Sequence, residues 1–455
     1  MGEEQIKKVP KKVFFGWPTR AIATSISAVL LGYVTYFATD FMGISAATAG
    51  IIFMITKIFD GFTDIIAGYL IDRTKTKWGK GRPYELAVIG YMLSLALIFC
   101  APEMGVPASC VYLFVMYSLV NSVFMTMLNC CDSVYLANAL EDQRQSVSIL
   151  AFTGFISLVF TMGGSIIMPQ MIAAMGSTRA GWMKIAVMIT IPCTLIGLIR
   201  FFTVKERTDI TQASENKVTL REMLGLLKQN KYILIFAVII LVSNIGSNIG
   251  NGAGVYYFMY IMHDIGLQSI MALSMVAVVL TIVLTPVLSK KFGFMKVMRA
   301  ATLIGAVGYL IRLIDVSNIG LLFASSALAL LGFNTMFSFA GSFIINCMDY
   351  GEWKTEIRSE GTIACAQSVT AKIGAAFGAG AVGVLMGIAG YQGSIEAQAA
   401  SANIMIILLN TVIPAVFCVG QYILLRKFDL EEKMPQIQEE LAKRRAEKAA
   451  ERKEN

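Results

Sequence analysis

Three charged residues interrupt an apolar stretch near the start of the chain. Lys57, Asp60 and Asp64 are spaced three and four apart, so on a helix their side chains lie on one face. Thr63 lies beside this stripe. Two carboxylates one turn apart provide hard oxygen ligands for a small cation, or they share a proton because adjacent negative charges repel. The structural alternative is an ion-pair network with a neighbouring helix, but two acids for one lysine leave a surplus negative charge.

The composition places these charges in a membrane. Of 455 residues, 56% are hydrophobic and 15% are charged, and the mean hydropathy is +0.66. In a typical soluble domain, about a quarter of the residues are charged. Apolar segments long enough to cross a hydrocarbon core of about 30 Å recur throughout the sequence. We therefore predict an all-α polytopic membrane protein, and a polar N-terminus that enters the first span directly indicates no cleavable signal peptide.

The pattern of hydropathy predicts about twelve spans in two groups of six. The predicted spans lie near residues 16–41, 46–71, 84–101, 108–139, 145–173 and 180–203, and then 231–262, 267–289, 295–315, 318–347, 360–390 and 402–425. This grouping indicates two homologous six-helix halves, the architecture of major facilitator transporters. The predicted parts are an N-terminal half, a central loop, a C-terminal half and a charged tail, at residues 1–203, 204–230, 231–426 and 427–455.

The distribution of cations predicts the orientation. Lysines and arginines cluster at the N-terminus, after the second span, in the central loop and after the eighth span, whereas the alternate loops hold almost none. By the positive-inside rule, both termini are cytoplasmic in the cell (inner or plasma) membrane. The net charge of +8 therefore reflects the cations that set the membrane orientation, and we expect no nucleic-acid partner.

Other classes of function find little support. The eight cysteines have neither metal-site nor redox-motif spacing, and the single histidine, His263, cannot build a zinc site or a histidine relay. The sequence has no Walker loop and no G-x-S-x-G motif, so we expect neither an enzyme nor an organic cofactor. A non-transporting sensor is the remote alternative, but a tail of about thirty residues is too short for an effector domain.

Two longer motifs carry a family resemblance. They read KIFDGFTDIIAGYLIDRTKTKWGKGRP at 57–83 and DYGEWKTEIRSEG at 349–361, the second followed by Lys372 in TAKIG. The first resembles the signature of the glycoside–pentoside–hexuronide:cation symporters, the family that includes the melibiose permease, and the second agrees with it. The resemblance covers nearly the whole chain and implies a major facilitator fold.

The resemblance also implies a cation site. The family's carboxylate ligands fall on Asp60 and Asp64, and its neighbouring polar ligand falls on Thr63, where the best-known members have asparagine. A hydroxyl ligand of the fourth span falls on Thr126. We assign a coupling role to Lys57 and Lys372, the latter near the cation site in the family. The implied coupling ion is Na⁺ or H⁺.

The implied sugar site is less complete. The family's galactoside-binding acid of the first span has no counterpart before Asp40, and its acid of the fourth span falls on Asn129, one turn before Asp132. Polar and aromatic residues expected to face a central cavity are therefore the candidate substrate contacts: Tyr33, Tyr36, Asn129, Asp132, Asn244, Asn248, Asn334 and Gln367. For the asparagine- and glycine-rich stretch of the seventh span, helix packing through small residues is an equal alternative.

The loop after the second span resembles the gating loop of facilitators. Asp72 and Arg73, with Arg358 of the second motif, are the candidate gating residues, and charge–dipole contacts at helix ends would be made and broken there. Simple topological anchoring is the alternative. Together these features predict a monomeric symporter that imports a sugar or glycoside by alternating access. The alternative is the same machine acting on a non-sugar organic solute.

Overall fold

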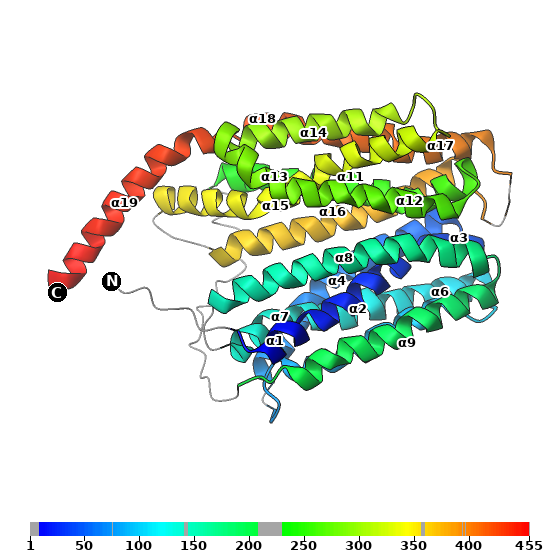
Figure 1. Ribbon diagram of the computed structural model, residues 1–455, viewed down its shortest axis with the longest axis horizontal. Helices are drawn as coiled ribbons and strands as arrows, with labels where there is room; N and C mark the ends of the chain where they lie inside the picture. The colour runs from blue at the N-terminus through cyan, green and yellow to red at the C-terminus, as the bar shows by residue number, and fades with distance from the viewer. Residues whose placement is uncertain are drawn as a thin grey trace. The chain divides into compact units, whose positions relative to one another are not determined.

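The computed structural model describes residues 9–74, 76–140, 144–207, 230–355, 360–393, 395 and 397–454. These residues are helical apart from short connections and one isolated bridge between Thr76 and Gly79, and the long helices of each unit lie side by side (Figure 1). The expected all-α membrane fold is confirmed.

The chain forms two compact units. Unit 1 comprises Met1–Ala213, Asn251–Leu273 and Ala379–Ile407, and unit 2 comprises Ser214–Gly250, Ser274–Gly378 and Leu408–Asn455. Two segments from the C-terminal half of the sequence therefore belong with the N-terminal half. The division of the chain at the central loop stays a prediction, because most of residues 204–230 lies outside the described ranges.

The predicted spans of the first half match helices in order. They are α1 (Lys11–Gly16), α2 (Pro18–Leu31), α3 (Val34–Asp40), α4 (Ala46–Arg73), the 3₁₀ turn η1 (Arg82–Leu86), α5 (Ala87–Phe99), α6 (Val106–Ser118), the π-helix η2 (Leu119–Met125), α7 (Thr126–Ala139), α8 (Arg144–Met175) and α9 (Arg179–Thr203). Helix α4 packs against α6, η2 and α7, the contact that forms the candidate cation site.

The second half follows the same order. Its elements are α11 (Lys231–Tyr256), the π-helix η3 (Tyr257–Ile261), η4 (Ile265–Leu267), α12 (Gln268–Ala272), η5 (Leu273–Met275), α13 (Val276–Phe292), α14 (Phe294–Ile311), α15 (Ile319–Thr355), α16 (Glu360–Ile388), α17 (Ala400–Asn410), α18 (Val412–Lys427) and α19 (Leu430–Glu454). The last of these is the charged tail.

Eleven of the described helices or helix groups are long and apolar enough to cross a membrane. Helix α4 is not among them, although its 28 residues extend about 42 Å and exceed the hydrocarbon thickness. It carries Lys57, Asp60 and Asp64 near its middle, within a largely apolar helix. Counted by length, α4 is the remaining span of the twelve that the sequence predicts.

The two halves share one capping arrangement. After α9, the Glu206 carboxylate accepts backbone N–H bonds from Lys80, Gly81 and Arg82 at 2.9–3.0 Å. The glycine before them, Gly79, has a φ of +108°, and a Cβ at this position would lie 2.2 Å from Glu206 Oε2. A carboxylate at such free N–H groups is favourable because of the local dipole.

The second half repeats this cap after α18. The Glu431 carboxylate accepts N–H bonds from Phe294 and Met295 at 2.9 and 3.0 Å, next to Gly293 with a φ of +84°. The two caps hold the loop after the second span and the loop after the eighth span. This correspondence agrees with the internal symmetry that the sequence indicates.

The charged tail packs through an apolar stripe. Met434, Ile437 and Leu441 of α19 are buried in a cluster that includes Phe343 and Phe428. Trp353 Nε1, at the end of α15, donates to Glu440 at 2.5 Å. Helix α19 therefore covers the end of unit 2 and leaves its charged face in solvent.

Candidate functional site

A single hydroxyl connects the two acids of α4. Thr126 Oγ1 lies 2.9 Å from Asp60 Oδ1 and 3.2 Å from Asp64 Oδ1. A hydroxyl carries one proton and can donate it fully to only one carboxylate at a time. Three oxygens from two helices thus converge on one place, a donor set that suits a small hard cation or a shared proton.

The π-helix η2 sets the position of this hydroxyl. A π turn holds one residue more than an α turn, and such turns are common at functional sites. Thr126 Oγ1 is also 3.4 Å from the Asn121 carbonyl oxygen, five residues earlier. The Asn121 side chain accepts a hydrogen bond from Lys57 Nζ at 3.0 Å. The wide turn therefore directs Asn121 and Thr126 toward the same neighbouring helix.

Thr63, the remaining predicted ligand, makes a local contact. Its hydroxyl is half-buried and donates to the Asp60 carbonyl oxygen at 3.0 Å. The lone pairs of a donating hydroxyl stay available to a cation. The ligand role of Thr63 therefore agrees with its geometry and stays a prediction.

Burial makes the charge balance of this site important. Asp60 is 7% exposed, and Asp64 and Lys57 are half-buried. Two carboxylates lie together here inside a membrane-spanning bundle, where each is costly to keep ionised. A bound cation or a shared proton therefore stabilises the site.

Asp132 of α7, a candidate substrate contact, belongs to a separate ion-pair network in unit 1. Arg20 of α2 pairs with Asp132, and Arg200 of α9 contacts it at 2.5 Å. Each arginine also lies 3.5 Å from Glu85. The Arg200 guanidinium stacks on the Trp17 ring at 3.2 Å. Two buried cations from α2 and α9 thus hold an acid of α7 and an acid of the turn η1.

This network limits what Asp132 can do. Glu85, Cys131 and Asp132 lie close enough together to suggest metal ligands, but the two arginines already compensate the acids. The Asp132 carboxylate is likewise engaged before any substrate arrives. Its substrate role remains a prediction. Sequence reasoning missed Arg20, Arg200 and Glu85, although an arginine inside the first apolar span was a visible signal.

The two tyrosine candidates lie in an aromatic cluster of unit 1. Tyr33 and Tyr36 are 4% and 6% exposed, and each ring centroid is 6.2 Å from that of Trp182. The Tyr33 hydroxyl donates to Gln268 Oε1 at 2.9 Å. The structure therefore gives Tyr33 and Tyr36 a packing role in addition to their predicted substrate role. Asn129, a further candidate substrate contact, is exposed on α7.

The candidates of unit 2 are half-buried on α11, α15 and α16. Three amides donate to the carbonyl oxygen one turn earlier in their own helix, those of Asn244, Asn248 and Asn334, at 2.8–2.9 Å. Gln367 and Lys372 lie on α16. Gly374 and Gly378 of α16 pack directly against Asn244 and Asn248. This part of the seventh span thus makes the expected small-residue helix contact, and its substrate role stays a prediction.

The gating residues are only partly described. The Arg73 guanidinium is exposed and lies 4.3 Å above the Tyr69 ring. The Asp72 side chain and Arg358 lie outside the described residues. The gating role of all three remains a prediction.

A cluster around Asp40 in unit 1 was not expected from the sequence. Tyr260 donates to Asp40 Oδ1, and Tyr391 donates to Asp40 Oδ2 at 2.8 Å. The two phenols are 3.0 Å apart, and Thr39 adds a bond to the same carboxylate at 2.6 Å. The cluster joins the end of the first span to the π-helix η3 and to the residues after α16. The sequence signal was a lone acid and tyrosines at the ends of distant spans.

Comparisons with known proteins identify the family of the chain. The family described as MFS/sugar transport protein matches residues 15–432. The "Isoprimeverose transporter" of Lactiplantibacillus pentosus is 30% identical over 87% of this chain and 83% of its own. A "Putative glycoside/cation symporter" of Escherichia coli (strain K12) is 26% identical over 91% of this chain and 90% of its own.

Solved structures show the same fold. A bacterial homolog of the human lysosomal transporter Spinster has a TM-score of 0.69 at 11% identity, covering 93% of this chain and 99% of that one. The nucleoside transporter NupG has a TM-score of 0.63 at 16% identity, covering 93% and 98%. At these identities the likeness concerns the fold alone.

Proposed function

We propose, because this chain belongs to the MFS/sugar transport protein family, that it couples an inward flow of Na⁺ or H⁺ to import of a sugar or glycoside. Family membership makes the chain a multi-pass membrane symporter that acts on a small solute with a coupling cation, and not an enzyme. In the proposed orientation both termini lie in the cytoplasm. The symporter is proposed to act as a monomer in the inner or plasma membrane of the cell.

The convergence of Thr126 on Asp60 and Asp64 is the observation that supports coupling. In the proposed cycle, a cation binds among these oxygens and neutralises the acids. The neutralised carboxylates then let the transporter close around the loaded cavity. Lys57 tunes the site through Asn121, and Lys372 of α16 is proposed to take part in coupling.

The names of several relatives support a sugar as the solute. They include an isoprimeverose transporter, a putative sulfoquinovose importer and a glucuronide carrier homolog. Asn129 in place of an acid, and the engagement of Asp132 by two arginines, favour the second candidate, a non-sugar organic solute. Both candidates use the same cation site.

The cluster around Asp40 supports alternating access. Tyr260 and Tyr391 come from the second half of the sequence, whereas Asp40 ends the first span. In the proposed cycle these bonds close one end of the path and break when it opens. Two hydrogen bonds to one carboxylate are enough to bias such an equilibrium by a few kcal/mol.

The test is solute-dependent cation flux in proteoliposomes with wild type, Asp64→Asn and the control Asp315→Asn. Asp315 is an exposed loop acid outside the site. A panel of glycosides, pentosides, uronides and uncharged amphipathic metabolites supplies the solutes. We expect a glycoside to drive Na⁺ or H⁺ entry in wild type and in the control but not in Asp64→Asn.

Other results would change the proposal. Flux with amphipathic metabolites alone would retain the symporter and replace the sugar by the non-sugar solute. Equal flux in Asp64→Asn and wild type would show that Asp64 is structural, and coupling through this site would then be wrong.

A further inference from the structure

Unit 2 contains an apolar groove between α13, α14 and α15, with a volume of about 650 Å³. Helix α13 lines it with Leu280, Leu284, Leu288 and Phe292, and α14 faces them with Ile304. Leu280 is 53% exposed and Ile304 is 43% exposed. These walls belong to membrane-spanning helices, where exposed leucine and isoleucine meet hydrocarbon rather than water.

The few hydroxyls in the groove do not make it polar. Thr281 donates to the Ala277 carbonyl oxygen at 2.8 Å, and Thr335 donates to that of Leu331 at 2.6 Å. Both bonds stay within one helix and satisfy the hydroxyl protons. A sugar would find few partners here, because a polar ligand needs hydrogen bonds in exchange for those it loses to water.

The length of the groove suits an acyl chain. From Ala277 to Phe292 the lining of α13 extends about 22 Å at the helical rise of ~1.5 Å per residue. One leaflet of a bilayer contributes about 15 Å of hydrocarbon, half of the usual thickness. An acyl chain that lies along α13 therefore fits within the groove with its headgroup at one end.

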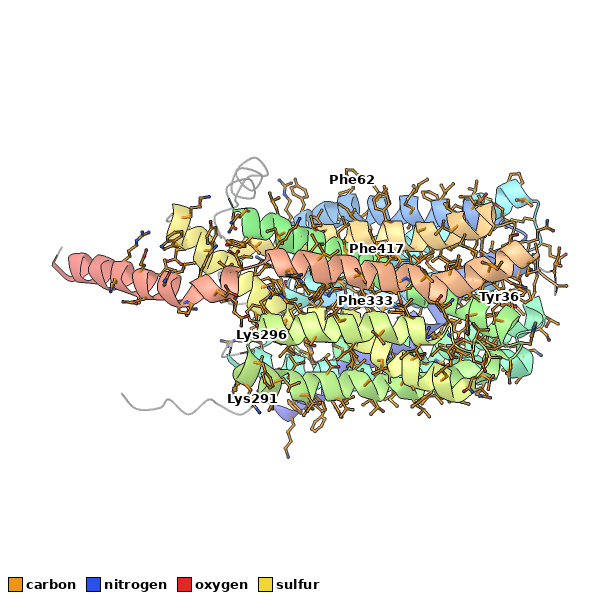
Figure 2. All side chains as sticks on the ribbon, turned by 90° about the horizontal axis from the view of Figure 1, so that it is seen from above. Tyr36, Phe62, Lys291, Lys296, Phe333 and Phe417 are labelled. Atoms are coloured by element: carbon orange, nitrogen blue, oxygen red, sulfur yellow. The ribbon has the colours of Figure 1, made fainter. Side chains whose placement is uncertain are left out.

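That end is positively charged. Lys296 lines the groove, and the Lys291 ammonium lies 5.2 Å from the centre of the Phe292 ring, which lines it too. Figure 2 labels Lys291 and Lys296 at the end of unit 2 that also carries α19. Glu431, an acid at the same end of unit 2, is already bound to the N–H groups of Phe294 and Met295.

We propose that this groove is a binding site for one phospholipid with an anionic headgroup. An acyl chain lies along α13, and the phosphate binds Lys291 and Lys296 at the helix ends. Basic pockets beside membrane helices recognise acidic headgroups in this way, and charge complementarity selects them over zwitterionic lipids. By the positive-inside rule the lipid belongs to the cytoplasmic leaflet.

The experiment is photo-crosslinking in proteoliposomes with a phosphatidylglycerol that carries a diazirine in its acyl chain. Phosphatidylcholine with the same acyl chain is the comparison lipid, and mass spectrometry locates the labelled peptides. We expect labelling of residues 277–304 by phosphatidylglycerol at several times the yield of phosphatidylcholine. In Lys291→Ala/Lys296→Ala this preference should be lost, with equal yields from the two lipids.

Two further variants control for loss of charge elsewhere and for misfolding. Arg426→Ala/Lys427→Ala removes two exposed cations at the end of α18, outside the groove, and should leave the labelling unchanged. Lys291→Arg/Lys296→Arg keeps both charges and should retain the preference, which separates charge from misfolding. Equal labelling by both lipids in wild type, or labelling outside residues 277–304, would overturn the proposal.

Discussion

Tyr391 donates a hydrogen bond of 2.8 Å to Asp40, although 351 residues separate them in the sequence. Tyr260 contributes a second phenol to the same carboxylate. The end of the first span is therefore held by side chains from the second half of the chain. Contacts of this kind must break and reform if the two halves alternate, and they offer a direct way to bias the equilibrium.

The first prediction concerns Tyr391→Phe. The change removes one hydrogen bond to a carboxylate, worth roughly 1.5–3 kcal/mol, while the aromatic ring remains. We expect the population with this end open to rise about tenfold or more. Spin labels at the exposed residues Val106 and Ile395, measured by pulsed electron resonance, report the opening as a longer distance.

The matched control is Tyr112→Phe. The Tyr112 hydroxyl donates to the Leu97 carbonyl oxygen at 2.8 Å, outside the cluster of Tyr260 and Tyr391. This variant should keep the wild-type distance distribution. If Tyr391→Phe also keeps it, the Asp40 cluster does not hold this end closed.

The second prediction concerns Thr126, which lies between the two acids. Thr126→Val keeps the shape of the side chain and removes the shared oxygen, so we expect cation affinity to fall about tenfold, the effect of roughly 1–2 kcal/mol. Thr126→Ser should retain most of the affinity because it keeps the hydroxyl. The measurement is cation-dependent solute uptake in proteoliposomes across a range of Na⁺ concentration and pH.

A contrary result for Thr126 is equally clear. Equal cation dependence in Thr126→Val and wild type would show that the hydroxyl only joins the helices. Cation binding would then rest on the carboxylates of Asp60 and Asp64 alone.

The third prediction concerns the two caps. Glu206→Ala leaves the N–H groups of Lys80, Gly81 and Arg82 without their charged acceptor. Buried donors that lose a charged partner cost roughly 1–3 kcal/mol, so the Tm in detergent should fall by several degrees. Glu431→Ala should cost somewhat less, because that carboxylate accepts two such bonds.

The control for the caps is Glu439→Ala on α19. Glu439 pairs with Lys443 at 2.8 Å, but both side chains are more than two-thirds exposed. Such a pair contributes little to stability, so the Tm should stay within about a degree of wild type. A fall as large as that of Glu206→Ala would mean that the loss reflects removal of charge in general.

The fourth prediction separates structure from substrate binding at Asp132. Asp132→Asn removes a negative charge that compensates Arg20 and Arg200. Both arginines are buried, so we expect a lower Tm. If the residue acts only through these arginines, the KM for solute should change little in the protein that remains folded. A large rise in KM with an unchanged Tm would instead place Asp132 in the substrate site.

Most of the fold could be predicted because spans are defined locally. Each predicted span lies within a few residues of a helix, since a run of about twenty apolar residues has few alternatives in a bilayer. Helix α4 agrees with the predicted span 46–71 in spite of the charges near its middle. The division into units was less predictable, because 251–273 and 379–407 join unit 1 through contacts between distant segments.

Within the candidate site, the sequence by itself determined the pair Asp60 and Asp64, since residues four apart share a face of any α-helix. Tertiary structure decided their partners. Asn121 reaches Lys57 through a π turn that breaks the 3.6-residue period, and no spacing rule anticipates it. Asp40 finds Tyr260 and Tyr391 only after the chain folds, because hydrogen bonds between distant segments depend on packing rather than on local sequence.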